Sequence, residues 1–325
     1  MTAIAPTVLA TCGGLVAGDW TDSLYGPLLH HAIELAQVVG RRPRVTHINT
    51  AGGDQRHVEG AELEAARAAG VDASHVRFFP HPNIPDLRAH VLAQDVVWVS
   101  GGSLLNLLAV WRAHGLDEIL REAWQRGVVL AGGSAGALCW HEGGTTASRG
   151  PDISALPDGL GLVPGSLAVH YDSDPRRRPA HQAGVASGEL PGGYALEEGT
   201  GLVYQGTTLV DVVSERQGAT VWRVQRTEAG GTTGVSETRI EPRLLPPLLE
   251  PAAGLAARET TVLAASPVGD GASRASDAAV SITSPNGAPV SPTPDAPIES
   301  AAMPPSHTTS PSPTPSTIEE ARTPR

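Results

Sequence analysis

Lysine is absent from the 325-residue sequence, so all 23 basic residues are arginines. A Schiff-base lysine, a Ser-Lys dyad and a Walker A phosphate-binding lysine are therefore excluded. A nucleophile in this chain needs another activating group. Histidine is the side chain whose ordinary pKa suits that task near neutral pH, and the sequence contains twelve of them.

Cysteine is scarce, and Cys12 and Cys139 offer neither a disulfide framework nor a zinc spacing. We expect both to be buried packing residues. The formal net charge of -11 argues against a general nucleic-acid binder, which needs a cationic surface. No apolar run is long enough to span a membrane, and the N-terminus lacks the pattern of a signal peptide. These absences favour a cytoplasmic protein without nucleic-acid or membrane partners. No metal cluster or cofactor motif is present, so we predict no cofactor.

Aromatic residues are missing from the C-terminal part of the chain, because all twelve lie at or before Trp222. The segment from Pro251 to Pro324 instead holds 13 of the 28 prolines. Such a composition cannot bury enough apolar surface to offset the entropy of ordering the chain. We predict one folded domain over residues 1–248 and a disordered Pro/Ser/Thr/Ala-rich tail over residues 249–325.

Short apolar runs alternate with helical patterns in the first half of the chain, which is typical of an α/β fold with a mostly parallel sheet. Strands are predicted at 7–11, 45–49, 76–79, 96–99 and 128–131. Helices are predicted at 23–39, 58–69, 86–93 and 104–126, the last broken at His114-Gly115. Further β-like segments lie at 166–171, 201–204, 208–213 and 219–224, with a hairpin turn at Gln205-Gly206. These later segments predict an antiparallel edge to the sheet.

Ser134 lies in Gly132-Gly133-Ser134-Ala135-Gly136, directly after a predicted strand and before a predicted helix. A strand, a sharp turn and a helix in that order expose one hydroxyl beside backbone amides, as in serine hydrolases. The amides of Ala135 and Gly102 are candidate donors to an oxyanion. Gly102 lies in the glycine turn after the predicted strand at 96–99. The turn at Gly102 could equally be an ordinary strand-to-helix connection with Ser103 as helix cap.

His170 ends a β-like run, where its imidazole could face the same sheet edge as Ser134. His141 lies about 10 Å along the nucleophile helix, which is too far for a direct hydrogen bond. The remaining histidines in helical or exposed settings are interpreted as surface residues: His30, His31, His57, His75, His90 and His114. From the residues alone, His170 is one candidate base among several.

Four ordered segments together resemble the peptidase E group of serine peptidases, the aspartyl dipeptidases. They are SGGSLLNLLAVWRAHGLD, AGGSAGALCW, DGLGLVPGSLAVHYDSDPRRRPAHQ and GYALEEGTGLVY. The resemblance spans most of residues 7–245. It implies a three-layer α/β/α fold, a nucleophile at Ser134, a base at His170 and an oxyanion hole formed by Gly102 and Ala135.

The same resemblance implies a small peptide substrate with an N-terminal Asp, whose carboxylate needs a cation. Arg176, Arg177 and Arg178 are the candidates, because a guanidinium binds a carboxylate through two hydrogen bonds. A charged helix start at the surface is the alternative interpretation of this run. A homodimer is compatible with the sequence.

The sequence departs from this family at the acid that completes the catalytic triad of serine, histidine and acid. Relatives usually carry a Thr-Asp-Ser-like run after the nucleophile helix, whereas this chain has Ala147 in place of the Asp. Asp152 is the first substitute and Glu142 the second, since the related cyanophycinases use a Glu; Asp158, Asp172 and Asp174 are further options. The alternatives to an Asp-dipeptidase are a cyanophycinase-like exopeptidase and a catalytically weak small-ligand-binding homologue.

Overall fold

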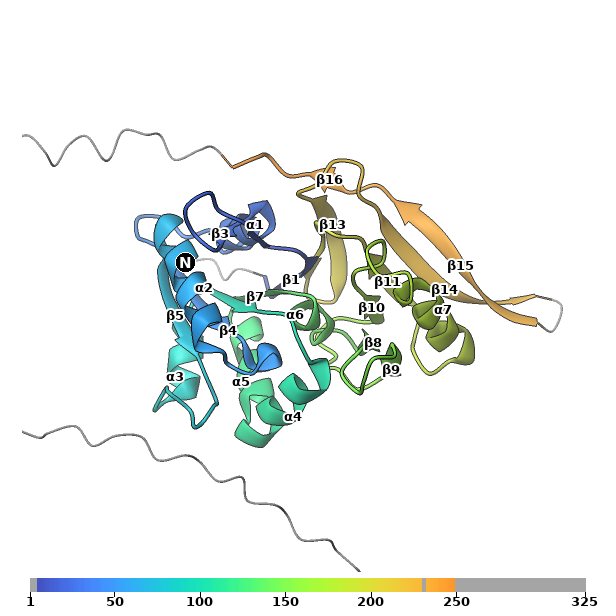
Figure 1. Cartoon of the computed structure of the whole chain (residues 1–325), viewed down its shortest axis with the longest axis horizontal. Helices are drawn as coiled ribbons and strands as arrows, with labels where there is room; N and C mark the ends of the chain where they lie inside the picture. The colour runs from blue at the N-terminus through green and yellow to red at the C-terminus, as the bar shows by residue number, and fades with distance from the viewer. Residues whose placement is uncertain (1–4, 230–231, 249–325) are drawn as a thin grey trace, which may run out of the picture. The chain divides into compact units, whose positions relative to one another are not determined.

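The computed structural model describes residues 5–229 and 232–248, so the predicted tail at 249–325 lies outside the described residues. An eight-stranded sheet forms the centre of the described chain (Figure 1). Its strands, in spatial order, are β16 (Arg243–Leu244), β13 (Thr208–Ser214), β12 (Thr200–Gln205), β1 (Thr7–Cys12), β7 (Val129–Gly133), β6 (Val96–Val99), β4 (Arg44–Ile48) and β5 (Asp72–Val76). The five strands from β1 to β5 in this order are parallel, while β12 is antiparallel to β1 and β13 is antiparallel to β12.

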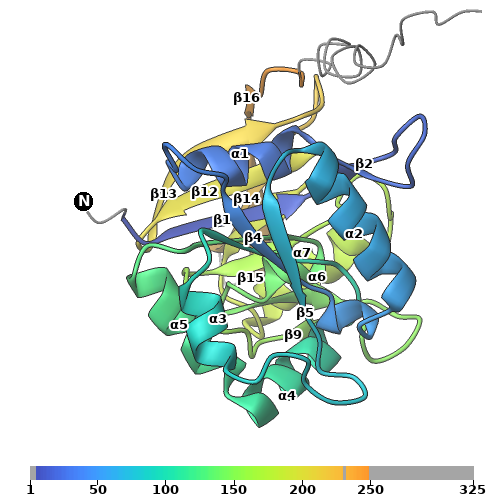
Figure 2. The ribbon, with the colours of Figure 1, turned by 90° about the vertical axis from the view of Figure 1, so that its left-hand side faces the viewer.

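Helices cover both faces of this sheet. Successive side chains of a strand point to opposite faces, and apolar residues on each face pack against helices. Leu9 packs in one core cluster with residues of α1 (Pro27–Leu35) and α2 (Arg56–Ala68). Val8 and Ala10 pack in another, with residues of α3 (Leu87–Leu92), α4 (Leu104–His114), α5 (Leu116–Gln125) and α6 (Ala135–Leu138). Figure 2 shows α2 and α5 on opposite sides of β4 and β5. The predicted three-layer α/β/α fold is thus confirmed.

A second sheet follows α6, and the sequence patterns did not predict it as a separate sheet. Its strands, in spatial order, are β15 (Thr232–Ile240), β14 (Val221–Ala229), β11 (Gly193–Leu196), β10 (Ser166–Ala168), β8 (Gly143–Thr146) and β9 (Ser154–Leu156). The strands β8, β10 and β11 are parallel, and β14 and β15 form the long hairpin at the right of Figure 1. Val185 of α7 (Arg177–Ser187) packs with Ala168 of β10 and Ala195 of β11.

Several element boundaries agree with the sequence, and two differ for identifiable reasons. Gly115, in the left-handed conformation, ends α4 and precedes α5, and Gln205 pairs with Thr208 across the predicted hairpin turn. The strand predicted at 76–79 instead ends at Val76, because the Asp54 carboxylate accepts hydrogen bonds from the amides of Phe78 and Phe79.

The helix predicted at 23–39 is shorter, running from Pro27 to Leu35. Proline at the first helical position fixes its start, since its missing N–H is not needed there. The residues just before it, Leu24–Tyr25, form β3, which pairs with β2 (Leu15–Val16).

Candidate active site

The carboxyl ends of β1, β6 and β7 meet at one edge of the central sheet, the edge where open α/β sheets bind ligands. The end of β10 in the second sheet adjoins this edge, since Cys12 at the end of β1 contacts His170. The start of β12 lies there too, because Cys12 pairs with Thr200. Five chain segments therefore supply side chains to one place.

Ser134 connects β7 to α6 in a conformation that few residues adopt, with φ 58° and ψ −117°. Its amide donates to the Thr11 carbonyl at 3.1 Å. The flanking glycines are needed, because a Cβ on Gly132 would lie 2.4 Å from the Val99 carbonyl oxygen and one on Gly136 2.0 Å from the same atom. This close packing holds the strained turn in place and presents the Ser134 hydroxyl.

His170 follows β10 and also has a positive φ, 58°. Its Nε2 lies 2.9 Å from Ser134 Oγ, within hydrogen-bonding distance. Its backbone amide donates to Cys12 Sγ at 3.2 Å, which ties this turn to the end of β1. The structure therefore brings together the two residues that the sequence suggested as nucleophile and base.

Glu198 is the carboxylate beside His170, with Oε1 2.5 Å from Nδ1. It lies in the turn between β11 and β12 and also accepts a hydrogen bond from Ser173 Oγ at 2.7 Å. Partial burial acts to raise the pKa of Glu198, but the hydrogen bonds from His170 and Ser173 outweigh it and lower the pKa below its usual value. Glu198 is therefore ionised at neutral pH.

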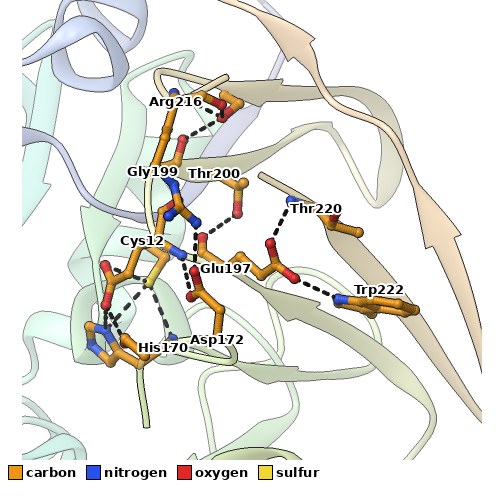
Figure 3. A network of polar contacts seen from close by, with 12 residues as sticks. Cys12, His170, Asp172, Glu197, Gly199, Thr200, Arg216, Thr220 and Trp222 are labelled. Carbon is orange, nitrogen blue, oxygen red and sulfur yellow. Dashed lines mark hydrogen bonds and ion pairs between the residues drawn. The ribbon is translucent and has the colours of Figure 1, made fainter. Parts of the chain in front are cut away.

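A second pair of charges supports the turn that carries Glu198 (Figure 3). The Asp172 carboxylate accepts from the Glu198 amide at 2.9 Å and from the Arg216 guanidinium at 2.5 Å. Arg216 Nε in turn donates to the Glu198 carbonyl at 3.1 Å. The neighbouring Glu197 points elsewhere and accepts from the Thr220 amide and from Trp222 Nε1.

The structure places neither sequence-based candidate for the triad acid beside His170. Among the described residues, no hydrogen bond or ion pair joins Asp152 or Glu142 to His170. Asp152 is exposed in the loop between β8 and β9. Glu142 Oε2 instead accepts from the Gly165 amide at 2.9 Å. The sequence patterns did not single out Glu198, although this residue lies in GYALEEGTGLVY, one of the four segments that resemble the peptidase E group. The pair Glu197-Glu198 shortly before the predicted strand at 201–204 was the sequence feature that could have indicated it.

Gly102 and Ala135 both line a cavity of about 260 Å³ beside Ser134. Gly102 has φ +138°, and a Cβ there would lie 2.2 Å from the Ala51 carbonyl oxygen, so only glycine fits. Ala135 is the first residue of α6, whose amide has no intrahelical acceptor. The turn at Gly102 also connects β6 to α4, as in the alternative interpretation of this segment. Ser103 Oγ caps α4 by accepting from the Asn106 amide.

Of the three candidate arginines, only Arg177 lines this cavity, together with Gly102, Ser103, Asn106, Ser134, Ala135, Leu138, Thr146, Ala147 and Ser148. Its side chain is 14% exposed and lies 3.6 Å from the Asp174 carboxylate. Burial lowers the pKa of Arg177 and Asp174 opposes this change. Arg176 pairs with Asp174 at the surface, and Arg178 stacks on Trp222 while it binds Glu237.

Both cysteines are buried, as expected, but Cys12 does more than pack. Its Sγ lies 3.5 Å from His170 Nδ1 (Figure 3). The same sulfur lies 3.4 Å from Glu198 Oε2. Burial raises the pKa of the Cys12 thiol far above its usual range, and the Glu198 charge adds to this effect. Cys139 does not contact these residues and donates to the Gly136 carbonyl of α6.

A buried polar cluster lies behind the glycine turn and corrects the surface placement expected for His75. His75 Nε2 is 2.9 Å from the Glu62 carboxylate, which also accepts from the Ser100 hydroxyl. His47 Nε2 lies 2.5 Å from the Tyr25 hydroxyl. His75, Glu62 and His47 are almost fully buried, so this cluster is part of the core rather than of a solvated face.

Two solved structures align with this chain, and the first of them supports this architecture. A peptidase from an acI-B1 actinobacterium has a similar fold, with a TM-score of 0.51 and 18% identity over 74% of this chain and 96% of that one. A Listeria monocytogenes EGD-e protein described as a candidate peptidase E aligns with a TM-score of 0.44 and 17% identity, over 63% of this chain and 96% of that one. Among the described residues, no helix has the length and apolar character needed to cross a membrane.

The sequence comparisons are more specific. The profile of peptidase family S51 matches residues 21–212. The uncharacterized peptidase YgaJ of Bacillus subtilis (strain 168) is 40% identical over 194 residues, which cover 60% of this chain and 83% of YgaJ. The chain therefore belongs to peptidase family S51 and is a hydrolase of the peptidase type, in agreement with its resemblance to the peptidase E group.

Proposed function

We propose that this chain is a serine peptidase that cleaves short peptides, preferably dipeptides with an N-terminal Asp. The proposal rests on one observation. Ser134 Oγ, the two nitrogens of His170 and Glu198 Oε1 form a continuous line of contacts of 2.9 and 2.5 Å. A hydroxyl, an imidazole and an ionised carboxylate in that order are the functional parts of a catalytic triad.

The chemistry follows from the direction of these contacts. Ser134 Oγ attacks the peptide carbonyl while His170 Nε2 accepts its proton, and Glu198 holds the imidazole in the Nδ1–H tautomer and stabilises the imidazolium. The amides of Gly102 and Ala135 donate to the oxyanion of the tetrahedral intermediate. His170 then gives the proton to the leaving amine, and water hydrolyses the acyl-enzyme on Ser134 by the same route in reverse.

The cavity beside Ser134 supports a preference for short acidic peptides. With about 260 Å³ it has room for few residues, and Arg177 is the arginine that lines it. A guanidinium with most of its surface buried binds a carboxylate strongly, since water competes little for it. Ala147, which replaces the usual triad Asp, also lines this cavity, so it enlarges the substrate space while Glu198 supplies the carboxylate.

A peptide panel with an active-site label tests the proposal. Wild type and Ser134→Ala are incubated with Asp-X, Glu-X, non-acidic and β-Asp-Arg dipeptides, and separately with a fluorophosphonate. We expect labelling of wild type alone and Ser134-dependent turnover that is fastest for Asp-X. Faster cleavage of β-Asp-Arg would favour the cyanophycinase-like alternative. Absence of both labelling and turnover would favour the weak small-ligand binder and refute the proposal.

A further inference from the structure

Three potential metal ligands from separate segments converge on the far side of the His170 imidazole from Ser134. They are Cys12 Sγ, His170 Nδ1 and a Glu198 carboxylate oxygen, and all lie within 4.8 Å of one another. Cys12 comes from β1, His170 from the turn after β10 and Glu198 from the turn before β12. A thiol, an imidazole and a carboxylate are the three side-chain types that bind Zn²⁺.

The two distances from Cys12 Sγ match those in a tetrahedral zinc site. Bonds of about 2.3 Å to sulfur and about 2.0 to 2.2 Å to nitrogen and oxygen, at tetrahedral angles, place sulfur about 3.5 to 3.7 Å from the other two ligands. Cys12 Sγ lies 3.5 Å from His170 Nδ1 and 3.4 Å from Glu198 Oε2. His170 Nδ1 contacts the other carboxylate oxygen of Glu198, Oε1, at 2.5 Å, and the ion would replace this hydrogen bond when it binds Nδ1.

An ion could reach these three ligands from solvent, because two of them are partly exposed. The side chains of His170 and Glu198 are 30% and 38% exposed, although Cys12 is buried beneath them. Both side chains also line a second cavity of about 240 Å³ next to Ser134, bounded by Gly13 and Leu15. This cavity could supply water as the fourth ligand.

We propose that Cys12, His170 and Glu198 form an inhibitory Zn²⁺ site on the Nδ1 side of the His170 imidazole. Metal binding to these ligands is independent of the proposed function, whereas the inhibition rests on it. Three protein ligands with one position left for water are the usual set of an open zinc site.

The proton balance explains why bound zinc would inhibit. The ion binds the Cys12 thiolate, so the thiol proton is released to solvent. It also takes the lone pair of His170 Nδ1, so the single proton of the neutral imidazole resides on Nε2, facing Ser134 Oγ. Nε2 can then no longer accept the Ser134 proton, and Glu198 no longer orients the ring. Arg177 and its cavity are untouched, so kcat should fall while KM stays the same.

The test uses full-length, metal-free protein as wild type, Cys12→Ala and Cys139→Ala, the last being a control at the other buried cysteine. Co²⁺ is added as a spectroscopic substitute, and Zn²⁺ binding is measured by titration calorimetry. We expect one tight equivalent and a sulfur-to-cobalt charge-transfer band in wild type and Cys139→Ala. Cys12→Ala should lose the band and bind Zn²⁺ at least tenfold more weakly. Cys12→Ser replaces it if the alanine variant does not fold.

Inhibition is then compared with each protein's own metal-free rate. Zn²⁺ should lower kcat of wild type and Cys139→Ala reversibly, with recovery on chelation, and at least tenfold more Zn²⁺ should be needed for Cys12→Ala. Equal binding and equal inhibition of all variants would place the ion at other histidines and overturn the proposal. If metal-free wild type has no peptidase activity, the proposed function fails, and the charge-transfer band still decides whether the site exists.

Discussion

His170 and Glu198 are 28 residues apart in the sequence, yet Nδ1 of one lies 2.5 Å from Oε1 of the other. The pairing of β10 with β11 explains this approach. These strands are parallel, and Ala168 is level with Ala195, so each of the two residues follows shortly after its own strand end. The contact depends on strand register in the second sheet rather than on sequence proximity.

Replacing Glu198 should therefore disable catalysis without disturbing binding. We expect Glu198→Gln to lower kcat by about 10³- to 10⁴-fold with little change in KM, because an amide cannot stabilise the imidazolium or enforce its tautomer. Steady-state kinetics on an Asp-X dipeptide measure this. Asp152→Asn and Glu142→Gln serve as matched controls and should stay near the wild-type rate. A large loss in either control with a normal Glu198→Gln would restore the sequence-based assignment.

The sequence predicted local features of the site well and long-range ones poorly. Ser134 and the glycines around it are contiguous, so the elbow could be recognised from residues 132–136 alone. Glu198 could not be chosen on spacing, because its place depends on the register of β10 and β11. The second sheet was missed for a similar reason: short strands such as β8, with the sequence GGTT, carry little periodic signal.

The three adjacent arginines illustrate the same limit. The sequence patterns could not distinguish among them as carboxylate-binding candidates. In the structure, the start of α7 places the three side chains in different surroundings. Arg176 faces Asp174 at the surface, Arg178 lies over Trp222, and Arg177 lines the cavity. The position of the Arg177 guanidinium, 3.6 Å from Asp174, depends on the folded chain.

Arg177 should thus control the preference for acidic substrates. We expect Arg177→Ala to raise KM for Asp-X dipeptides by about 10- to 100-fold, the worth of a hydrogen bond to a charged group, with a much smaller effect on non-acidic dipeptides. Arg177→Lys should recover part of the loss. Arg176→Ala is the control, because this side chain is solvent-exposed and should leave the substrate preference unchanged. Equal effects on acidic and neutral substrates would argue against carboxylate recognition by Arg177.

Gly136, two residues after Ser134, should be essential for stability. In Gly136→Ala the new Cβ would lie 2.0 Å from the Val99 carbonyl oxygen, a backbone atom that cannot move easily. We expect a loss of more than about 2 kcal/mol in the free energy of unfolding, as for other overpacked core sites. Gly60→Ala, in the exposed face of α2 with no atom within 4 Å of the new Cβ, should instead stabilise the protein by about 0.5 to 1 kcal/mol. Denaturant unfolding measures both.

Buried histidines should make the fold sensitive to acid. Burial lowers the pKa of His47, His141 and His181 from 6.5 to about 4. Between these two values the unfolded chain binds more protons than the folded chain, so stability falls as the pH decreases. Each such histidine should cost about 2 kcal/mol between pH 7 and pH 5.

His181 offers the cleanest test of this effect. Neither of its ring nitrogens has a hydrogen-bond partner among the described residues, and the ring packs edge-on against Tyr171. His181→Leu removes the titrating group while keeping an apolar side chain, so the loss of unfolding free energy between pH 7 and pH 5 should shrink by about 2 kcal/mol. Urea unfolding at the two pH values measures the change, with His57→Leu at an exposed position as control. An undiminished pH dependence in His181→Leu would show that this imidazole does not stay neutral in the folded protein.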